Sequence, residues 1–131
     1  MPTFAINQLV RDNRVMLFEA DGCKVAHTKL SGPEFDDALR AKLMEEATEA
    51  ALTDEVDDVV KECADILEVM SALLKLHGKT VEDLMAVAAG RKAKLGGFEA
   101  RTYIETLTAP EGSETCAYHK ANADKYEEID A

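Results

Sequence analysis

The sequence predicts an all-α fold organised around a hairpin of two long helices. Aromatic residues make up only 5% of the 131 residues and tryptophan is absent, which suits helix-on-helix packing better than a β-sandwich. Apolar residues recur with the helical period in two neighbouring segments, 33–52 and 54–77. Because only a short turn separates these segments, the two helices are expected to pack antiparallel.

The residues before the hairpin predict a short helix and a brief extended segment. The apolar run from Val15 to Phe18 stops at Asp21, so a first helix is expected to end there, with Gly22 in the turn. Residues 24–30 are expected to be extended and to lie at the periphery. The first long helix then begins at a Ser-Gly-Pro sequence, because proline suits the first helical position.

The residues after the hairpin predict one further helix and a tail. Thr80 and Asp83 form a capping-box pattern that begins this helix. Residues 98–107 carry a mixed pattern that fits either an extended segment or a short helix. We therefore expect a helical domain over residues 1–109 and a polar, acidic tail over residues 110–131, which a neighbouring subunit could order.

The second long helix is apolar on two sides. One face carries Val59, Ile66, Val69, Met70 and Leu73, and the other edge carries Val60, Leu67 and Leu74. Cys63 lies on the apolar side and is expected to be a small core residue. Because a single short third helix cannot cover both sides, we expect a homodimer or a dimer of dimers, in which helices of two protomers complete a four-helix core.

The charge balance argues against two classes of partner. Lys and Arg together number 15 against 26 Asp and Glu, which gives a net charge of -11. Such a surface repels the phosphate backbone of nucleic acids and the headgroups of anionic membranes, so neither is an expected partner. We find neither an apolar signal segment nor a run long enough to span a membrane, and we expect a soluble cytoplasmic protein.

Acidic side chains form two sets on the long helices. Glu45 and Glu46 lie four and three residues before Glu49, while Glu62 and Asp65 are three residues apart, so each set projects from one helix face. Glu46 falls inside an apolar stripe, where a carboxylate must be paired, protonated or metal-bound. Hard oxygen ligands on facing helices suit Mg²⁺ or Mn²⁺. The alternative is a pair of amphipathic helices with ordinary acidic margins.

The order of these carboxylates resembles the metal-binding signature of the MazG-like, all-α nucleoside triphosphate pyrophosphohydrolases. Two further stretches are similar to the branch described as phosphoribosyl-ATP pyrophosphohydrolase-like. They are Asn7-Gln8-Leu9-Val10-Arg11-Asp12 and Lys92-Ala93-Lys94-Leu95-Gly96-Gly97-Phe98-Glu99. The resemblance covers residues from about Asn7 to Leu107. The branch usually has lysine where Gln8 stands. If that lysine contacts phosphate in the branch, another basic residue must supply the positive charge in this chain, and Arg11 and Arg14 are the candidates.

The resemblance implies Mg²⁺-dependent hydrolysis of a nucleoside triphosphate to the monophosphate and pyrophosphate, a reaction that could serve house-cleaning of the nucleotide pool. The implied metal ligands are Glu46, Glu49, Glu62 and Asp65. Glu45 is either a further ligand or the base that orients the attacking water. Lys42, one turn before Glu46, is expected to contact phosphate, or to pair with Glu45 and Glu49 when no metal is bound.

Three basic residues are candidate substrate ligands. Arg11 either contacts phosphate or anchors the N-terminal segment. Arg91 and Lys94 precede Gly96 and Gly97, whose amides allow close approach of an anion. The alternative for this pair is the ordinary preference for cations in the last turn of a helix.

Two other functions stay open. The branch name suggests hydrolysis of phosphoribosyl-ATP in histidine biosynthesis, which the same metal chemistry would serve. An acidic helical interaction module without catalysis is the alternative from another class of protein. A di-iron bundle is disfavoured, because that chemistry requires Glu-x-x-His on a helix and the sequence has no such pattern.

Overall fold

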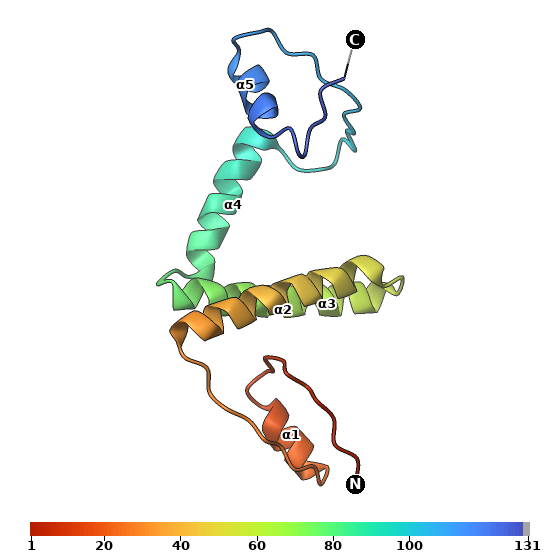
Figure 1. Cartoon of the computed structure of the whole chain (residues 1–131), viewed down its shortest axis with the longest axis vertical. Coiled ribbons are helices and arrows are strands. Elements are labelled where there is room, and N and C mark those ends of the chain that lie inside the picture. The colour runs from red at the N-terminus through yellow and green to blue at the C-terminus, as the bar shows by residue number, and fades with distance from the viewer. Residues whose placement is uncertain (130–131) are drawn as a thin grey trace. The chain divides into compact units, whose positions relative to one another are not determined.

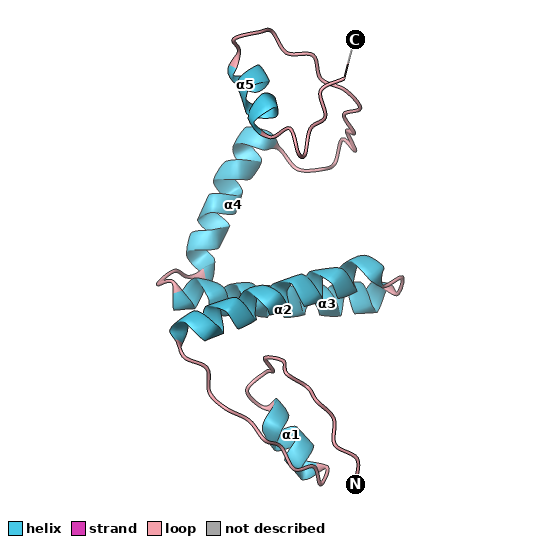
Figure 2. Cartoon of the chain, in the orientation of Figure 1, coloured by secondary structure: helices cyan, strands magenta, loops and turns pink. Residues whose placement is uncertain are grey.

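The computed structural model describes residues 1–129, and its regular elements are all helices. The helices are α1 (Arg14–Ala20), α2 (Gly32–Leu52), α3 (Val56–Leu76), α4 (Val81–Leu95) and α5 (Glu114–Ala121). Figure 2 shows loops between the helices and no strand within these residues. The all-α prediction is therefore confirmed.

The antiparallel hairpin of α2 and α3 is also confirmed, and Figure 1 shows the two helices side by side. The backbone N–H of Thr53 donates to Glu49 O at 3.1 Å and closes α2 before the turn. At the opposite end of the pair, His77 Nε2 lies 2.7 Å from Asp36 Oδ1, which joins the end of α3 to the first half of α2. This contact and one from Arg40 lower the pKa of the Asp36 carboxyl.

The end of α3, the start of α4 and the turn after α1 lie where the sequence predicts them. The chain leaves α3 through Gly78, whose φ of 73° lies in the left-handed region that glycine adopts without strain. The predicted capping box is present at α4: the N–H of Thr80 donates to Asp83 Oδ2 at 2.9 Å, and the N–H of Asp83 donates to Thr80 Oγ1 at 3.1 Å. Gly22 likewise has a positive φ of 86° in the predicted turn after α1.

The C-terminal region contains a helix that sequence reasoning missed. α5 begins after Ser113, whose Oγ accepts a hydrogen bond from the N–H of Cys116 at 3.1 Å. The negative charge of Glu114, in the first turn, interacts favourably with the positive end of the helix dipole. Residues 98–107 form neither a helix nor a strand. The chain separates into two compact units, residues 1–94 and the part from Leu95 onwards, so the predicted boundary after residue 109 falls within the second unit.

Few apolar side chains are buried within one protomer. Leu39 and Val69, at 2% and 8% exposure, are the only buried apolar residues in the part of the chain that the structure describes. The prediction that Cys63 belongs to the core is wrong for the isolated chain, because the residue is exposed on α3. Exposed large side chains occur along the whole chain and include Phe4, Met16, Phe18, Met44, Val56, Val60, Leu67 and Met85. None of the described helices is both long and apolar enough to cross a membrane.

The exposed apolar edge of α3 motivates a prediction about assembly. Val60 and Leu67, seven residues apart on one side of this helix, are 64% and 49% exposed. Leu67→Glu is expected to turn a homodimer into monomers or to prevent folding, because it forfeits roughly 1.5–3 kcal/mol of leucine burial and places a charge in an apolar interface. Sedimentation velocity measures the change. Lys79→Glu, at an exposed position just after α3, should leave assembly intact, and a folded wild-type monomer at micromolar concentration would contradict the predicted dimer.

Candidate functional site

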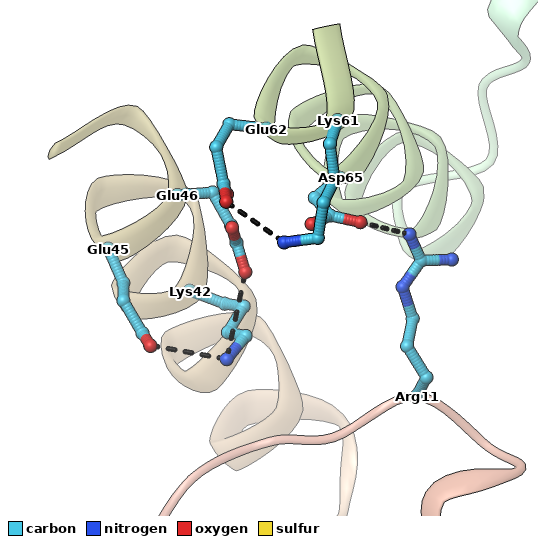
Figure 3. A network of polar contacts seen from close by, with 7 residues as sticks. All are labelled: Arg11, Lys42, Glu45, Glu46, Lys61, Glu62 and Asp65. Carbon is cyan, nitrogen blue, oxygen red and sulfur yellow. Dashed lines mark hydrogen bonds and ion pairs between the residues drawn. The ribbon is translucent and has the colours of Figure 1, made fainter. Parts of the chain in front are cut away.

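Three carboxylates converge where α2 faces α3. Glu46 and Glu49 lie one helical turn apart on α2, and Glu62 lies on α3. One oxygen from each of these residues lies within 4.8 Å of the other two, a spacing that could hold a metal ion. Figure 3 shows the Glu46 and Glu62 side chains extending towards each other from the two helices. We refer to Glu46, Glu49 and Glu62 as the carboxylate trio.

Two members of the trio are buried with part of their hydrogen-bonding capacity unused. Glu46 and Glu62 are each 7% exposed, while Glu49 is exposed. The Oε2 atoms of Glu46 and Glu62 are buried and have no hydrogen-bond partner. An unpaired buried acceptor costs about 1–3 kcal/mol, and more when it is charged. A divalent cation held by both oxygens would remove this penalty, so these residues fit a bound metal ion.

The environment of the trio shifts the pKa values of the two buried carboxyls in opposite directions. Burial, the interaction with Glu62 and the negative charges of Glu49 and Asp65 raise the pKa of Glu46 from 4.5 to about 7. In contrast, the contact with Glu46, followed by the Lys61 ammonium, lowers the pKa of Glu62. In the absence of metal, the proton of this pair therefore resides on Glu46 rather than on Glu62.

Two lysines act as internal counter-ions for these carboxylates (Figure 3). Lys42 Nζ lies 3.2 Å from Glu45 Oε2 and 3.8 Å from Glu46 Oε1. Lys61 Nζ lies 3.1 Å from Glu62 Oε1. The sequence indicated Lys42, although with Glu49 rather than Glu46 as its second partner. Lys61 was missed, and the signal that could have found it is its position directly before Glu62.

Asp65 faces an arginine from the N-terminal segment. Arg11 Nη2 lies 2.8 Å from Asp65 Oδ1 (Figure 3). Arg11 Nη1 also lies 4.0 Å from Glu68 Oε2. Asp65 is not part of the trio. Of the two roles expected for Arg11, this geometry displays the anchor, because the ion pair ties the segment before α1 to α3. The contact also places the guanidinium beside the predicted fourth metal ligand.

Of the remaining predicted site residues, one is linked to the trio by ion pairs and two are not. Glu45 is one residue from Glu46 and is joined to it through Lys42. Arg91 and Lys94 are exposed on α4, and in the described chain no ion pair links them to the carboxylates. The trio, Asp65 and three cations thus form the site, with α2, α3 and the N-terminal segment as its supports.

Comparisons with known proteins leave this site to be interpreted from its own chemistry. No protein-family model, curated protein or solved structure matches the chain.

The raised pKa of Glu46 predicts an unusual pH dependence of stability. Because the folded state holds this proton more tightly than the unfolded state, folding takes up a proton between pH 4.5 and about 7. The metal-free protein should therefore lose stability as pH rises through that window. Relative to Glu46→Gln, we expect a loss on the order of 1 kcal/mol, since one pKa unit is worth about 1.4 kcal/mol and the lowered pKa of Glu62 opposes part of the effect.

Urea unfolding in a chelating buffer at pH 5 and pH 7.5 measures this difference. Glu105→Gln, at an exposed position outside the site, should keep the wild-type pH dependence. If the stability of the wild type and of Glu46→Gln changed with pH in the same way, a buried proton on Glu46 would be ruled out.

The carboxylate trio also predicts stabilisation by metal. Mg²⁺ or Mn²⁺ should raise the melting temperature, because a ligand of the folded state alone stabilises by about 2.7 kcal/mol at 100 times its dissociation constant. Glu49→Gln should largely remove this effect and Asp65→Asn should reduce it, whereas Glu105→Gln should retain it. In the absence of metal, Glu49→Gln should melt higher than the wild type, since like-charge repulsion is relieved. If neither Mg²⁺ nor Mn²⁺ changed the melting temperature of the wild type, the metal site would be excluded.

Proposed function

We propose that this chain is a Mg²⁺-dependent nucleoside triphosphate pyrophosphohydrolase, acting as a homodimer or a dimer of dimers, and that it releases nucleoside monophosphate and pyrophosphate. The observation that carries the proposal is the pair of buried, unpartnered oxygens on Glu46 and Glu62 beside the exposed Glu49. All-oxygen ligands suit Mg²⁺, with Mn²⁺ as a substitute. Because one side of the trio is exposed, substrate phosphates could supply further ligands.

The cations around the trio support a phosphate substrate. Lys42, Lys61 and Arg11 each contact a carboxylate that a metal ion would neutralise. Once the metal takes over that charge, these side chains are free to turn towards phosphate oxygens. Such local positive charge is needed, because a chain with a net charge of -11 repels a triphosphate at long range. Arg91 and Lys94 remain proposed phosphate ligands on α4.

The residues of the site divide the chemical work between them. When bound, Mg²⁺ would offset the negative charge of the phosphates and lower the pKa of an attacking water. Glu46 must release its proton before it can act as a ligand, and a pKa of about 7 places that release near neutral pH. Glu45, held by Lys42 at 3.2 Å, is the proposed group that orients the water. Glu49, Glu62 and Asp65 complete the proposed ligand set.

The proposed reaction predicts a specific product pattern. With Mg²⁺ and a panel of nucleoside triphosphates and phosphoribosyl-ATP, the products should be a monophosphate and pyrophosphate in equal amounts, without orthophosphate or a diphosphate. Glu46→Gln should reduce turnover at least 100-fold. Glu46 is the proposed buried metal ligand, and no solvent water can take its place without leaving buried polar atoms unpaired. Ion-exchange chromatography of the products and an assay for pyrophosphate measure both effects.

Two controls and two possible outcomes complete the assay. Glu105→Gln should retain wild-type turnover, and circular dichroism should confirm that Glu46→Gln is folded. Orthophosphate as the first product would reject the proposed reaction even with an intact metal site. Metal binding without turnover of any nucleotide would favour the non-catalytic interaction module.

A further inference from the structure

A small pocket adjoins the site on the side of Lys42 and Glu45. It has a volume of about 110 Å³, and its walls come from the N-terminal segment and from α2. Lys42 and Glu45 line the pocket and also belong to the ion-pair network that reaches Glu46. An occupant of the pocket would therefore lie one lysine side chain away from the carboxylate trio.

The size and lining of the pocket suit one ring. Leu9, Ala38 and Ala41 supply apolar surface, and the two alanines leave space where larger side chains on α2 would fill it. A closed cavity of about 150 Å³ accommodates a benzene ring. An open pocket of about 110 Å³ is smaller than that cavity, so a six-membered ring would enter it edge first and in part, and a whole nucleotide would not fit.

Two carboxamides line the same pocket. The side chains of Asn7 and Gln8 each offer an N–H donor and a carbonyl acceptor, and both residues are exposed. This pairing of donor and acceptor matches the edges of nucleobases, which asparagine and glutamine contact with two hydrogen bonds. Asn7 has a φ of 49°, a left-handed conformation that asparagine adopts more readily than most residues.

We propose that this pocket binds the nucleobase of the substrate, with the base edge on Asn7 and Gln8 and the phosphates on the carboxylate site. The inference rests on the proposed function and adds to it the subsite that distinguishes a nucleotide from inorganic polyphosphate. The apolar lining covers the ring faces, while the amides read its edge. Lys42 and Glu45 stand between the two subsites.

The test compares nucleotides with a substrate that has no base. Kinetic constants are measured with Mg²⁺ for ATP, GTP, CTP and UTP, while inorganic tripolyphosphate is used as a substrate or as a competitive inhibitor. In the double variant Asn7→Gly/Gln8→Ala, the KM of the preferred nucleotide should rise about tenfold, as expected for two lost hydrogen bonds. Its kcat and the tripolyphosphate constant should stay within about twofold of the wild type. Glycine at position 7 retains access to the positive φ.

A second variant tests the pocket by filling it. Ala41→Leu should raise the same KM without changing the tripolyphosphate constant, because leucine is a good helix former and its side chain would occupy the ring site. Ala51→Leu, an exposed change on the same helix away from the pocket lining, is the matched control and should leave all constants unchanged.

The outcomes separate the pocket from the reaction. Equal changes for nucleotide and tripolyphosphate would overturn the base subsite while leaving the pyrophosphohydrolase intact. Absence of any wild-type turnover would overturn the reaction instead. In that case, calorimetry with Mg²⁺ compares nucleoside monophosphates with ribose 5-phosphate. Tighter binding of a monophosphate that is lost in Asn7→Gly/Gln8→Ala would support the subsite, and equal binding of the two ligands would overturn it.

Discussion

Glu46 and Glu62 are buried and face each other between α2 and α3, so these two helices can pack together only if the charge of the two carboxyls is balanced. Each is 7% exposed and each leaves one oxygen without a hydrogen bond, so the interface of α2 and α3 contains an unfavourable centre. The metal-free protein reduces the cost by keeping a proton at Glu46, as its pKa of about 7 indicates. Because Leu39 and Val69 are the only fully buried apolar residues among those described, one protomer has little to offset that cost. A bound cation and a second protomer would each supply part of the missing stability.

Charge also positions the N-terminal segment. Arg11 contacts Asp65 at 2.8 Å, whereas Phe4 and Ile6, 75% and 58% exposed, find no apolar cover in the described chain. The segment is therefore held against α3 by an ion pair that a metal at Asp65 would weaken. Asn7 and Gln8, which line the small pocket, lie four and three residues before Arg11 in the same segment.

The parts of the fold that sequence predicted are those with local causes. Helical periodicity and turn residues indicated α2 and α3, and the Thr80–Asp83 capping box indicated the start of α4. The signal of α5, a serine cap followed by glutamate, was hidden in a polar segment that lacks an apolar stripe. Within the site, helical spacing brought Glu46 and Glu49 to one face. The pairing of Arg11 with Asp65 and the pocket beside Lys42 depend on where a loop folds back, and no local pattern encodes that position.

The distribution of burial bears on the choice between an enzyme and an interaction module. An acidic surface that recruits a basic macromolecule must present its charges to that partner, because a buried carboxylate cannot reach another protein. At this site the exposed carboxylate is Glu49, while Glu46 and Glu62 are covered by the hairpin that carries them. A small cation can reach such oxygens from the Glu49 side, whereas a protein side chain would have to separate the helices. A metal ion would use both of the oxygens that the fold leaves unpaired, so this distribution of burial favours the proposed metal site over recruitment of a macromolecule.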